Sequence, residues 1–208
     1  MAGMDPDLPT LIEYGYTIGI FPMADEKGQL GWYSADPRGI LELEEFHVPR
    51  RLARLIRQER FRVTVNEAFS QVIQSCADRS STWISPLIIE AYTELHRRGK
   101  AHSVEAWHGS TLVGGLYGIS LGGAFFGESM FAYEDDASKV CLVFLVERLK
   151  ARGYRLLDCQ MVTPHMARFG ARLISAAAYR RRLEDALKVS CSFAPPAARR
   201  APASHPPE

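Results

Sequence analysis

Asp158 and Gln160 have the residue types and the spacing of either a reaction centre or a structural hydrogen-bond pair. We expect residues 155–160 to form a β-strand, in which side chains two residues apart point to the same face. A carboxylate and an amide on one face can position a substrate or move a proton. The same carboxylate can instead hold a neighbouring backbone amide or Arg155, and the sequence leaves both interpretations open.

Glu128 is a second carboxylate of interest because it interrupts the apolar run of residues 125–131. An isolated carboxylate is costly to bury unless it has hydrogen-bonding partners. Glu128 is therefore either a structural hydrogen-bond centre or part of a binding site, and the residues alone do not decide between the two.

Arginines cluster in residues 50–62, which contain six arginines and one glutamate, although the formal net charge of the whole chain is only +1. We predict a helix over residues 49–60, on which Arg50, Arg54 and Arg57 share one face. A guanidinium group matches the geometry of phosphate, so this face is a candidate for binding nucleic acid. The alternative is an ordinary solvated helix face.

Four widely spaced cysteines form no pair or cluster at metal-ligand spacing. This pattern argues against a zinc site and against a disulfide framework, so we expect reduced thiols and no metal. Cys159, between Asp158 and Gln160, would point away from both on an alternating strand. We therefore discount a thiol nucleophile.

The chain also lacks the segments that direct proteins into or across membranes. The first nine residues have no apolar core of a signal peptide, and no run of about 18 apolar residues occurs. We therefore expect a cytoplasmic protein with no membrane partner. With 47% apolar and 24% charged residues, the composition is ordinary for a folded domain.

The expected elements begin with a helix over residues 8–20. They continue with a strand (40–48), a helix (49–60), a strand (61–65), two helices (67–76 and 86–96), three strands (101–108, 111–120 and 124–131), a helix (139–152), a strand (155–160), a helical turn (165–170) and a helix (179–188). This order predicts a mixed α/β (α+β) fold with a largely antiparallel sheet. We expect a small N-terminal domain over residues 1–60, a larger domain over 61–189 and a disordered tail over 190–208.

Eight segments, in order, resemble the leucyl/phenylalanyl-tRNA–protein transferase family over roughly residues 14–187. They are Gly19-Ile-Phe-Pro22, Trp32-Tyr-Ser-Ala-Asp-Pro-Arg38, Thr82-Trp-Ile84, Ala101-His-Ser-Val-Glu-Ala-Trp107, Val113-Gly-Gly-Leu-Tyr-Gly118, Gly127-Glu-Ser-Met-Phe131, Ala137-Ser-Lys139 and Asp158-Cys-Gln160. The chain departs from the family pattern in a short N-terminal portion, in Met23 where an aromatic residue is common, and in Tyr33 where Trp is common.

The resemblance implies an N-terminal domain that contacts tRNA and an acyltransferase-like (GNAT-type) catalytic domain. It also implies transfer of Leu or Phe, with Met left open, from aminoacyl-tRNA to the α-amine of proteins that begin with Lys or Arg, which marks them for degradation. The ester of the donor is already activated, so the reaction needs no cofactor. We expect a monomer, because no interface stripe is evident.

The resemblance also implies roles for individual residues. Asp158, Gln160 and Glu128 would lie at the reaction centre. The pocket for the donor side chain would be formed by Phe125, Met130, Leu142, Leu149 and Leu157. The terminal adenosine of the tRNA would stack on Trp32, Trp107 and Tyr117, and the acceptor stem would contact Arg50, Arg54 and Arg57. For the apolar and aromatic residues, plain core packing is the alternative.

Two other functions compete with aminoacyl transfer. A coenzyme-A-dependent N-acyltransferase needs a glycine-containing pyrophosphate loop before the long helix, and residues 130–139 contain no glycine. A non-catalytic RNA-binding module would explain the arginines and aromatics but would leave Glu128, Asp158 and Gln160 without a role.

Overall fold

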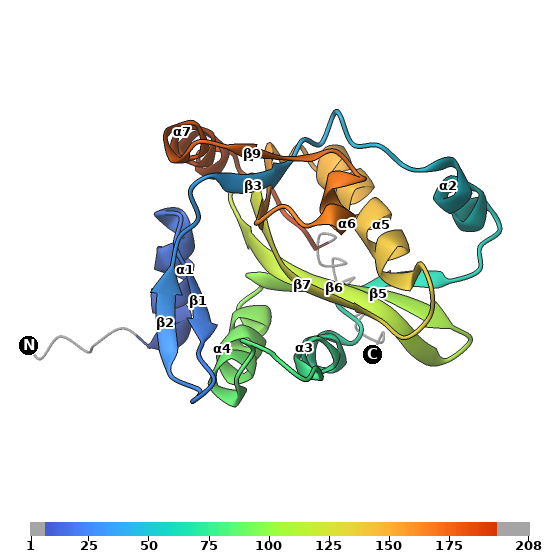
Figure 1. The fold of residues 1–208 in the computed structure, drawn as a ribbon, viewed down its shortest axis with the longest axis horizontal. Helices are drawn as coiled ribbons and strands as arrows, with labels where there is room; N and C mark the ends of the chain where they lie inside the picture. The colour runs from blue at the N-terminus through green and yellow to red at the C-terminus, as the bar shows by residue number, and fades with distance from the viewer. Residues whose placement is uncertain (1–6, 195–208) are drawn as a thin grey trace, which may run out of the picture.

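The computed structural model describes residues 7–194, which form helices and strands in alternating groups (Figure 1). The helices are α1 (Leu8–Thr17), α2 (Arg50–Arg57), α3 (Phe69–Ala77), α4 (Pro86–Arg97), α5 (Ala137–Ala151), α6 (Pro164–Ala167) and α7 (Ala176–Leu187). The strands are β1 (Phe21–Ala24), β2 (Leu30–Tyr33), β3 (Arg38–Leu41), β4 (Arg62–Val65), β5 (Ala101–His108), β6 (Thr111–Leu121), β7 (Ala124–Ala132), β8 (Leu156–Gln160) and β9 (Ala171–Ile174).

One seven-stranded sheet, with strand order β4-β5-β6-β7-β8-β3-β9, forms the centre of the fold. Every neighbouring pair in it is antiparallel except β7 and β8, which run parallel. Strands β1 and β2 pair separately as a short hairpin. The expected mixed α/β fold with a mostly antiparallel sheet is confirmed, although β1, β2 and β9 were not expected.

Two apolar cores lie on opposite faces of the large sheet. Helix α5 covers one face, and its apolar residues pack with Leu116 and Phe125 of the strands. Helices α3 and α4 cover the other face, where the N-terminal helix α1 and the C-terminal helix α7 join the same core (Figure 1). Helix α5 packs against the sheet on one side and against α2 on another, and most of its residues are therefore buried. It also forms the connection between the parallel strands β7 and β8.

Local signals explain where several helices begin and end. Ser85 caps α4 by accepting a hydrogen bond from the Ile88 amide at 3.4 Å, with Pro86 as the first helical residue. After α5, Gly153 has φ +76°, a left-handed conformation that ends the helix at low cost for glycine.

Several expected helix ends differ from the structure by up to three residues, and two other expectations differ in ways that change the fold. Of the strand expected over residues 40–48, only residues 40 and 41 are in a strand, as the end of β3. This strand belongs to the expected N-terminal domain of residues 1–60, but it lies in the large sheet between β8 and β9. The tail expected to be disordered from residue 190 instead contributes Phe193, which is 2% exposed and stacks on Phe125. An aromatic ring that fills a core position keeps this segment ordered. Residues 195–208 lie outside the described part of the chain.

Candidate active site

A cavity of about 270 Å³ opens where the parallel strands β7 and β8 separate. The two strands pair only from Ala124 opposite Leu156 to Phe126 opposite Asp158. Beyond this point β7 continues to Ala132 without a partner in β8, and residues of both diverging strands line the cavity. The separation of two strands thus places a cavity in the middle of the sheet.

The walls of the cavity are mainly apolar. Of the residues expected in a donor pocket, Met130, Leu142 and Leu157 line it. Phe125 and Leu149 do not, because both are fully buried in the core around α5. The other apolar wall residues, which were not expected, are Leu116, Leu145, Met161 and Met166. Leu145 lies three residues after Leu142 on α5, so helical spacing could have indicated it. Met166 lies in the turn after β8, which could have indicated it.

Glu128 reaches the polar end of the cavity because of a β-bulge in β7. Tyr117 pairs with Ser129 and Gly118 with Gly127, so Glu128 is the extra residue between them. A bulge re-aims a side chain relative to regular alternation. Its carboxylate accepts hydrogen bonds from Gln160 Nε2 at 3.0 Å and from the Tyr92 hydroxyl at 3.3 Å.

The Glu128 carboxyl group is held largely in its neutral form. Burial raises its pKa from 4.5 to about 8. Hydrogen bonds from Tyr16 and Tyr92 act in the opposite direction and lower the pKa, while the negative charge of Asp158 raises it further. The Tyr16 and Tyr92 hydroxyls lie 2.5 Å apart, so a chain of hydroxyl groups connects Glu128 to helix α1. Glu128 can therefore exchange a proton near neutral pH.

Asp158 is fully buried and its carboxylate is saturated with donors. Arg38 donates from Nε at 3.0 Å to Oδ1 and from Nη2 at 2.7 Å to Oδ2. The Tyr179 hydroxyl donates to Oδ2 at 2.6 Å, and the backbone amide of Gln160 donates to Oδ1 at 2.8 Å. Burial lowers the pKa of Arg38, but the hydrogen bonds and charge of Asp158 outweigh burial and raise it. Arg38 is thus a guanidinium cation held against the Asp158 carboxylate inside the protein.

The partner of Asp158 was not found from sequence. Of the two structural partners considered, the backbone amide is present, as that of Gln160, but the arginine is Arg38 and not Arg155. Arg38 is 120 residues away in the chain and enters the site because β3 pairs with β8. The segment Trp32 to Arg38 was recognised as a motif, but neither its spacing nor its composition indicates this contact.

Gln160 has an unusual backbone conformation, with φ +59°. Residues other than glycine rarely adopt this left-handed backbone conformation, and they keep it only where surrounding contacts hold it. The hydrogen bond from its amide to Asp158 fixes the backbone, and its side chain then donates to Glu128. Asp158, Gln160 and Glu128 are therefore brought together, as expected, in one hydrogen-bonded cluster.

Cys159 lines the same cavity and is half-buried. Burial, and then the charge of Asp158, raises the pKa of its thiol to about 12. At neutral pH the group is a thiol and not the nucleophilic thiolate. The discounting of Cys159 as a nucleophile thus agrees with its surroundings.

The three aromatics expected to stack on adenosine lie in different places. Tyr117 lines the cavity, and its buried hydroxyl has no hydrogen-bond partner among the described residues. Trp32 lies on the separate β1–β2 hairpin and is 41% exposed. Trp107 lies on β5, where its indole donates to Thr64 Oγ1 at 2.8 Å and its ring lies under Arg62. Neither tryptophan lines the cavity, so the structure does not form one stacking site from all three.

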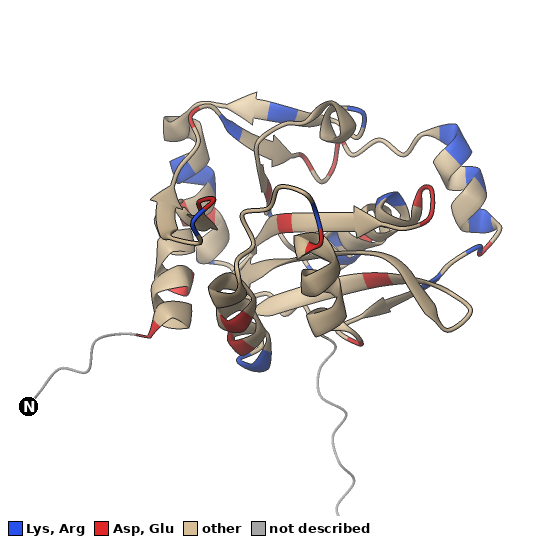
Figure 2. Ribbon diagram, turned by 60° about the horizontal axis from the view of Figure 1, so that its bottom comes forward, with Lys and Arg blue, Asp and Glu red and all other residues tan. Residues whose placement is uncertain are grey.

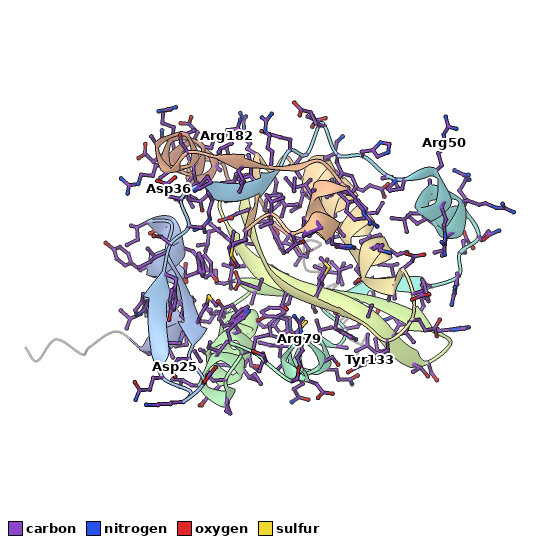
Figure 3. The ribbon with its side chains drawn as sticks, in the orientation of Figure 1. Asp25, Asp36, Arg50, Arg79, Tyr133 and Arg182 are labelled. Carbon is purple, nitrogen blue, oxygen red and sulfur yellow. The ribbon has the colours of Figure 1, made fainter. Side chains whose placement is uncertain are left out.

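Helix α2 presents its basic residues to solvent, as Figure 2 shows by the blue bands along it. Arg50, Arg54 and Arg57 are exposed, and none of them forms an ion pair with any residue of 7–194. Figure 3 shows Arg50 projecting outward from the first turn of α2. The opposite side of the helix packs on the core through Leu52.

A cavity with apolar walls and the carboxyl groups of Glu128 and Asp158 is typical of an enzyme active site that takes a substrate with a hydrophobic group. The sequence model of the leucyl/phenylalanyl-tRNA protein transferase family matches residues 40–184, and the model of that family's N-terminal domain matches residues 4–36. The chain belongs to the leucyl/phenylalanyl-tRNA–protein transferase family. Its activity is aminoacyl transfer from tRNA to the N-terminus of a protein.

Curated relatives carry the same family name. The transferase of Rubrobacter xylanophilus is 54% identical over 89% of this chain and 98% of its own length. That of Herpetosiphon aurantiacus is 53% identical over 89% of this chain and 97% of its own length. Among solved structures, a conserved protein of unknown function from Staphylococcus epidermidis has a TM-score of 0.46 at 11% identity, covering 83% of this chain and 66% of its own.

Two further observations concern residues 7–194. No group of three or more His, Cys, Asp or Glu side chains there is placed to hold a metal ion. In the same residues, the length and apolar content needed to cross a membrane are not found together in any helix.

Proposed function

We propose that the cavity between β7 and β8 receives the Leu or Phe side chain of the donor, so that the ester carbonyl lies beside Gln160 and Glu128. The observation that supports this most is the joining of apolar walls to Asp158 and Glu128 in one cavity, with Gln160 hydrogen-bonded to both of their carboxyl groups. A volume of about 270 Å³ is at the lower limit of the ~300–1,000 Å³ typical of small-molecule sites. That size suits one amino-acid side chain.

The reaction is the aminolysis of an ester. The acceptor α-amine forms a C–N bond to the carbonyl carbon, and the C–O bond to the ribose breaks. The amine loses a proton and the ribose oxygen gains one. Since the α-amine has an ordinary pKa of about 8 and that of Glu128 is about 8, proton transfer between the two is close to balanced. Glu128 is therefore the group that we assign to the amine proton.

We assign Asp158 a positioning role in this reaction. Each of its oxygens already accepts two hydrogen bonds or more, from Arg38, Tyr179 and the Gln160 amide. A carboxylate so occupied has little capacity left to take a proton from the substrate. By fixing the backbone of Gln160, it directs the Gln160 amide group toward Glu128 and the reacting amine.

We assign the acceptor stem of the tRNA to the exposed face of α2. An A-form stem is recognised mainly through its backbone, and Arg50, Arg54 and Arg57 are exposed and unpaired within the described chain. For the terminal adenosine, Trp32 offers a half-exposed ring, while Tyr117 lies in the cavity itself. Trp107 is set apart from both, and its indole is bonded to Thr64.

We further propose that the acceptors are proteins that begin with Lys or Arg, that transfer marks them for degradation, and that the enzyme acts as a cytoplasmic monomer. The Glu128 carboxyl group, which lines the cavity, can accept a hydrogen bond from a basic acceptor residue. Met as a further donor, with its unbranched apolar side chain, fits a cavity walled by Leu and Met residues.

The first experiment measures transfer of labelled Phe from its tRNA to a peptide that begins with Arg, without ATP or added metal. Matched peptides begin with Ala or carry an acetylated α-amine. We expect transfer only to the Arg peptide. Transfer to the acetylated peptide would contradict attack by the α-amine, and equal transfer to the Ala peptide would contradict the basic acceptor.

The Asp158→Asn variant tests the site in the same assay. We expect transfer to fall more than ~100-fold, as for other groups that organise a reaction centre, while the affinity for tRNA stays within about twofold. Unchanged transfer would remove Asp158 from the mechanism.

A further inference from the structure

A second cavity, of about 190 Å³, adjoins the first and has no role in the reaction described above. It is lined by residues from the start of α2, the start of α5 and the segment around α6, namely Pro49, Arg51, Leu52, Asp136, Lys139, His165, Arg168 and Phe169. His165 lines both cavities, so the α6 segment forms the wall between them. Figure 1 shows α6 beside α5, with α2 beyond them.

The lining of this second cavity is predominantly cationic. Arg51, Lys139 and Arg168 supply three positive charges, and Asp136 is the one carboxylate in the lining. Lys139 Nζ lies 2.5 Å from Asp136 Oδ1, and Arg51 Nη2 lies 3.9 Å from Asp136 Oδ2. Arg168 forms no ion pair with the described residues. The cavity therefore keeps an excess of positive charge and is suited to an anion.

His165 adds an unused polar group to the same place. Its Nε2 atom is buried and has no hydrogen-bond partner within residues 7–194, which is unfavourable unless a ligand supplies one. Burial, and then the charges of Lys139 and Arg168, lower the pKa of His165, so the ring is neutral at physiological pH. A neutral imidazole retains one N–H that can donate to an anion.

The start of α5 also faces this cavity through Asp136 and Lys139. No side chain of residues 7–194 forms a capping hydrogen bond at this helix start. Its N-cap residue is Asp136, whose carboxylate pairs with Lys139 and offsets part of the positive charge of the N-terminus. The Ala137-Ser-Lys139 segment, which resembles the family pattern, has no part in the cluster around Asp158. Lys139 instead lines the second cavity, where the segment can have a binding role.

We propose that this second cavity binds a phosphodiester group of the single-stranded 3′ end of the substrate tRNA. The inference rests on the proposed function, since it takes the donor side chain to lie in the first cavity. The positions of the three regions support it. The first turn of α2 lines the anion cavity, and the α6 segment separates that cavity from the donor cavity. A chain that runs from the α2 arginines to the donor cavity passes the anion cavity on the way.

The test uses the full-length enzyme and donors of increasing length. They are phenylalanyl-adenosine, which has no internucleotide phosphate, then phenylalanyl esters of the di- and trinucleotide 3′ ends, then Phe-tRNA. We expect wild-type kcat/KM to rise sharply when one particular phosphate is added. Lys139→Ala and Arg168→Ala should each lower kcat/KM about tenfold for every donor that has this phosphate, since a charge-assisted contact is lost. Transfer from phenylalanyl-adenosine should be unchanged.

Three comparisons keep the outcomes distinct. Lys188→Ala removes a more exposed cation far along the chain and should change nothing, while Lys139→Arg should restore most of the loss. If wild-type enzyme does not use phenylalanyl-adenosine or binds it without selectivity for its side chain, the donor cavity is wrongly assigned. If it does, but Lys139→Ala lowers transfer equally for all donors, Lys139 acts on the reaction and the phosphate site is overturned.

A free anion is the remaining alternative occupant. Binding of inorganic phosphate to wild type and to the Lys139→Ala and Arg168→Ala variants, measured by titration calorimetry, addresses it. If the variants lose phosphate binding but keep the full gain from the longer donors, the cavity holds a free anion and the assignment to tRNA is overturned. Competition between inorganic phosphate and only the phosphate-containing donors supports the assignment.

Discussion

The buried cluster around Asp158 and the exposed face of α2 differ in whether their charged side chains have ionic partners. In the cluster, the charged groups of Arg38 and Asp158 are bonded to each other and to neutral donors or acceptors. On α2, Arg50, Arg54 and Arg57 have no ionic partner within the described chain and lie in solvent. The same residue type thus serves two purposes a short distance apart in the sequence.

The difference shows what each region is built to do. A charge that is buried is tolerated only with complete partners, so it fixes geometry and its removal should affect folding. A charge left exposed contributes little to stability, so its removal should affect the binding of a charged ligand. The following experiments test this division, beginning with the largest expected effect.

Breaking the buried pair should destabilise the fold most. Arg38→Met leaves the Asp158 carboxylate buried without its cation, which we expect to lower the free energy of unfolding by about 3–5 kcal/mol. Asp158→Asn alone should also destabilise, and the double variant should cost less than the sum of the two. Urea unfolding of all four proteins measures the coupling. Strictly additive losses would contradict an ion pair that fixes geometry.

Glu128 should make stability depend on pH. Its pKa is raised from 4.5 to about 8, so between these values the folded protein holds a proton that the unfolded chain has released. The contribution of Glu128 to the free energy of unfolding is therefore largest below pH 4.5. It falls as the pH rises from 4.5 to about 8, by roughly 1.4 kcal/mol per pH unit. Unfolding midpoints from pH 5 to 8 measure it. The slope should flatten in Glu128→Gln but persist in Glu90→Gln, a change at an exposed carboxylate.

Removing the α2 arginines should affect binding without affecting folding. We expect the triple change of Arg50, Arg54 and Arg57 to Ala to raise the KM for Phe-tRNA about tenfold and to reduce the salt slope of log K by about 2, as a few phosphate contacts predict. The unfolding midpoint should not move. A matched variant with Lys27, Arg97 and Lys188 changed to Ala loses the same charge elsewhere. If it weakens tRNA binding equally, the effect comes from net charge and not from α2.

The smallest effect is expected at the apolar wall between the two regions. Met130→Ala should enlarge the donor cavity and shift the ratio of kcat/KM for Phe over Leu donors by less than about tenfold, since apolar pockets discriminate by only 1–3 kcal/mol per methylene group. Phe125→Leu, at a buried position that does not line the cavity, is the control for indirect packing effects. An equal shift in both variants would mean that Met130 does not contact the donor.

Sequence reasoning identified the elements whose signals are local. The Ser85-Pro86 start of α4, the hairpin of β5 and β6 and the long helix α5 follow from capping residues, alternation and apolar content within a few positions. The motif containing Glu128 and the Asp158-Cys-Gln160 motif supplied three residues that lie together in one hydrogen-bonded cluster. What these signals share is that each is complete within a short segment.

The contacts that sequence reasoning missed depend on pairing between distant segments. Arg38 reaches Asp158 because a four-residue strand inserts beside β8. The bulge at Glu128 changes which face its side chain takes, and regular alternation does not predict it. Trp107 was grouped with Trp32 because the family resemblance implies that both face the terminal adenosine, yet they lie on different sheets. Residue type suggests a role, but long-range pairing decides which residues share a site.

The position of Arg38 also bears on how this family can be recombined. The two family matches end at residue 36 and resume at residue 40, so Arg38 lies in the seam between them. Its guanidinium group donates to the Gly19 carbonyl at 3.1 Å on one side and to Asp158 on the other. A chimaera that joins the N-terminal part of one relative to the C-terminal part of another would therefore have to preserve both contacts of Arg38. Since Gly19 and Asp158 belong to different family matches, this one arginine links the two matched segments.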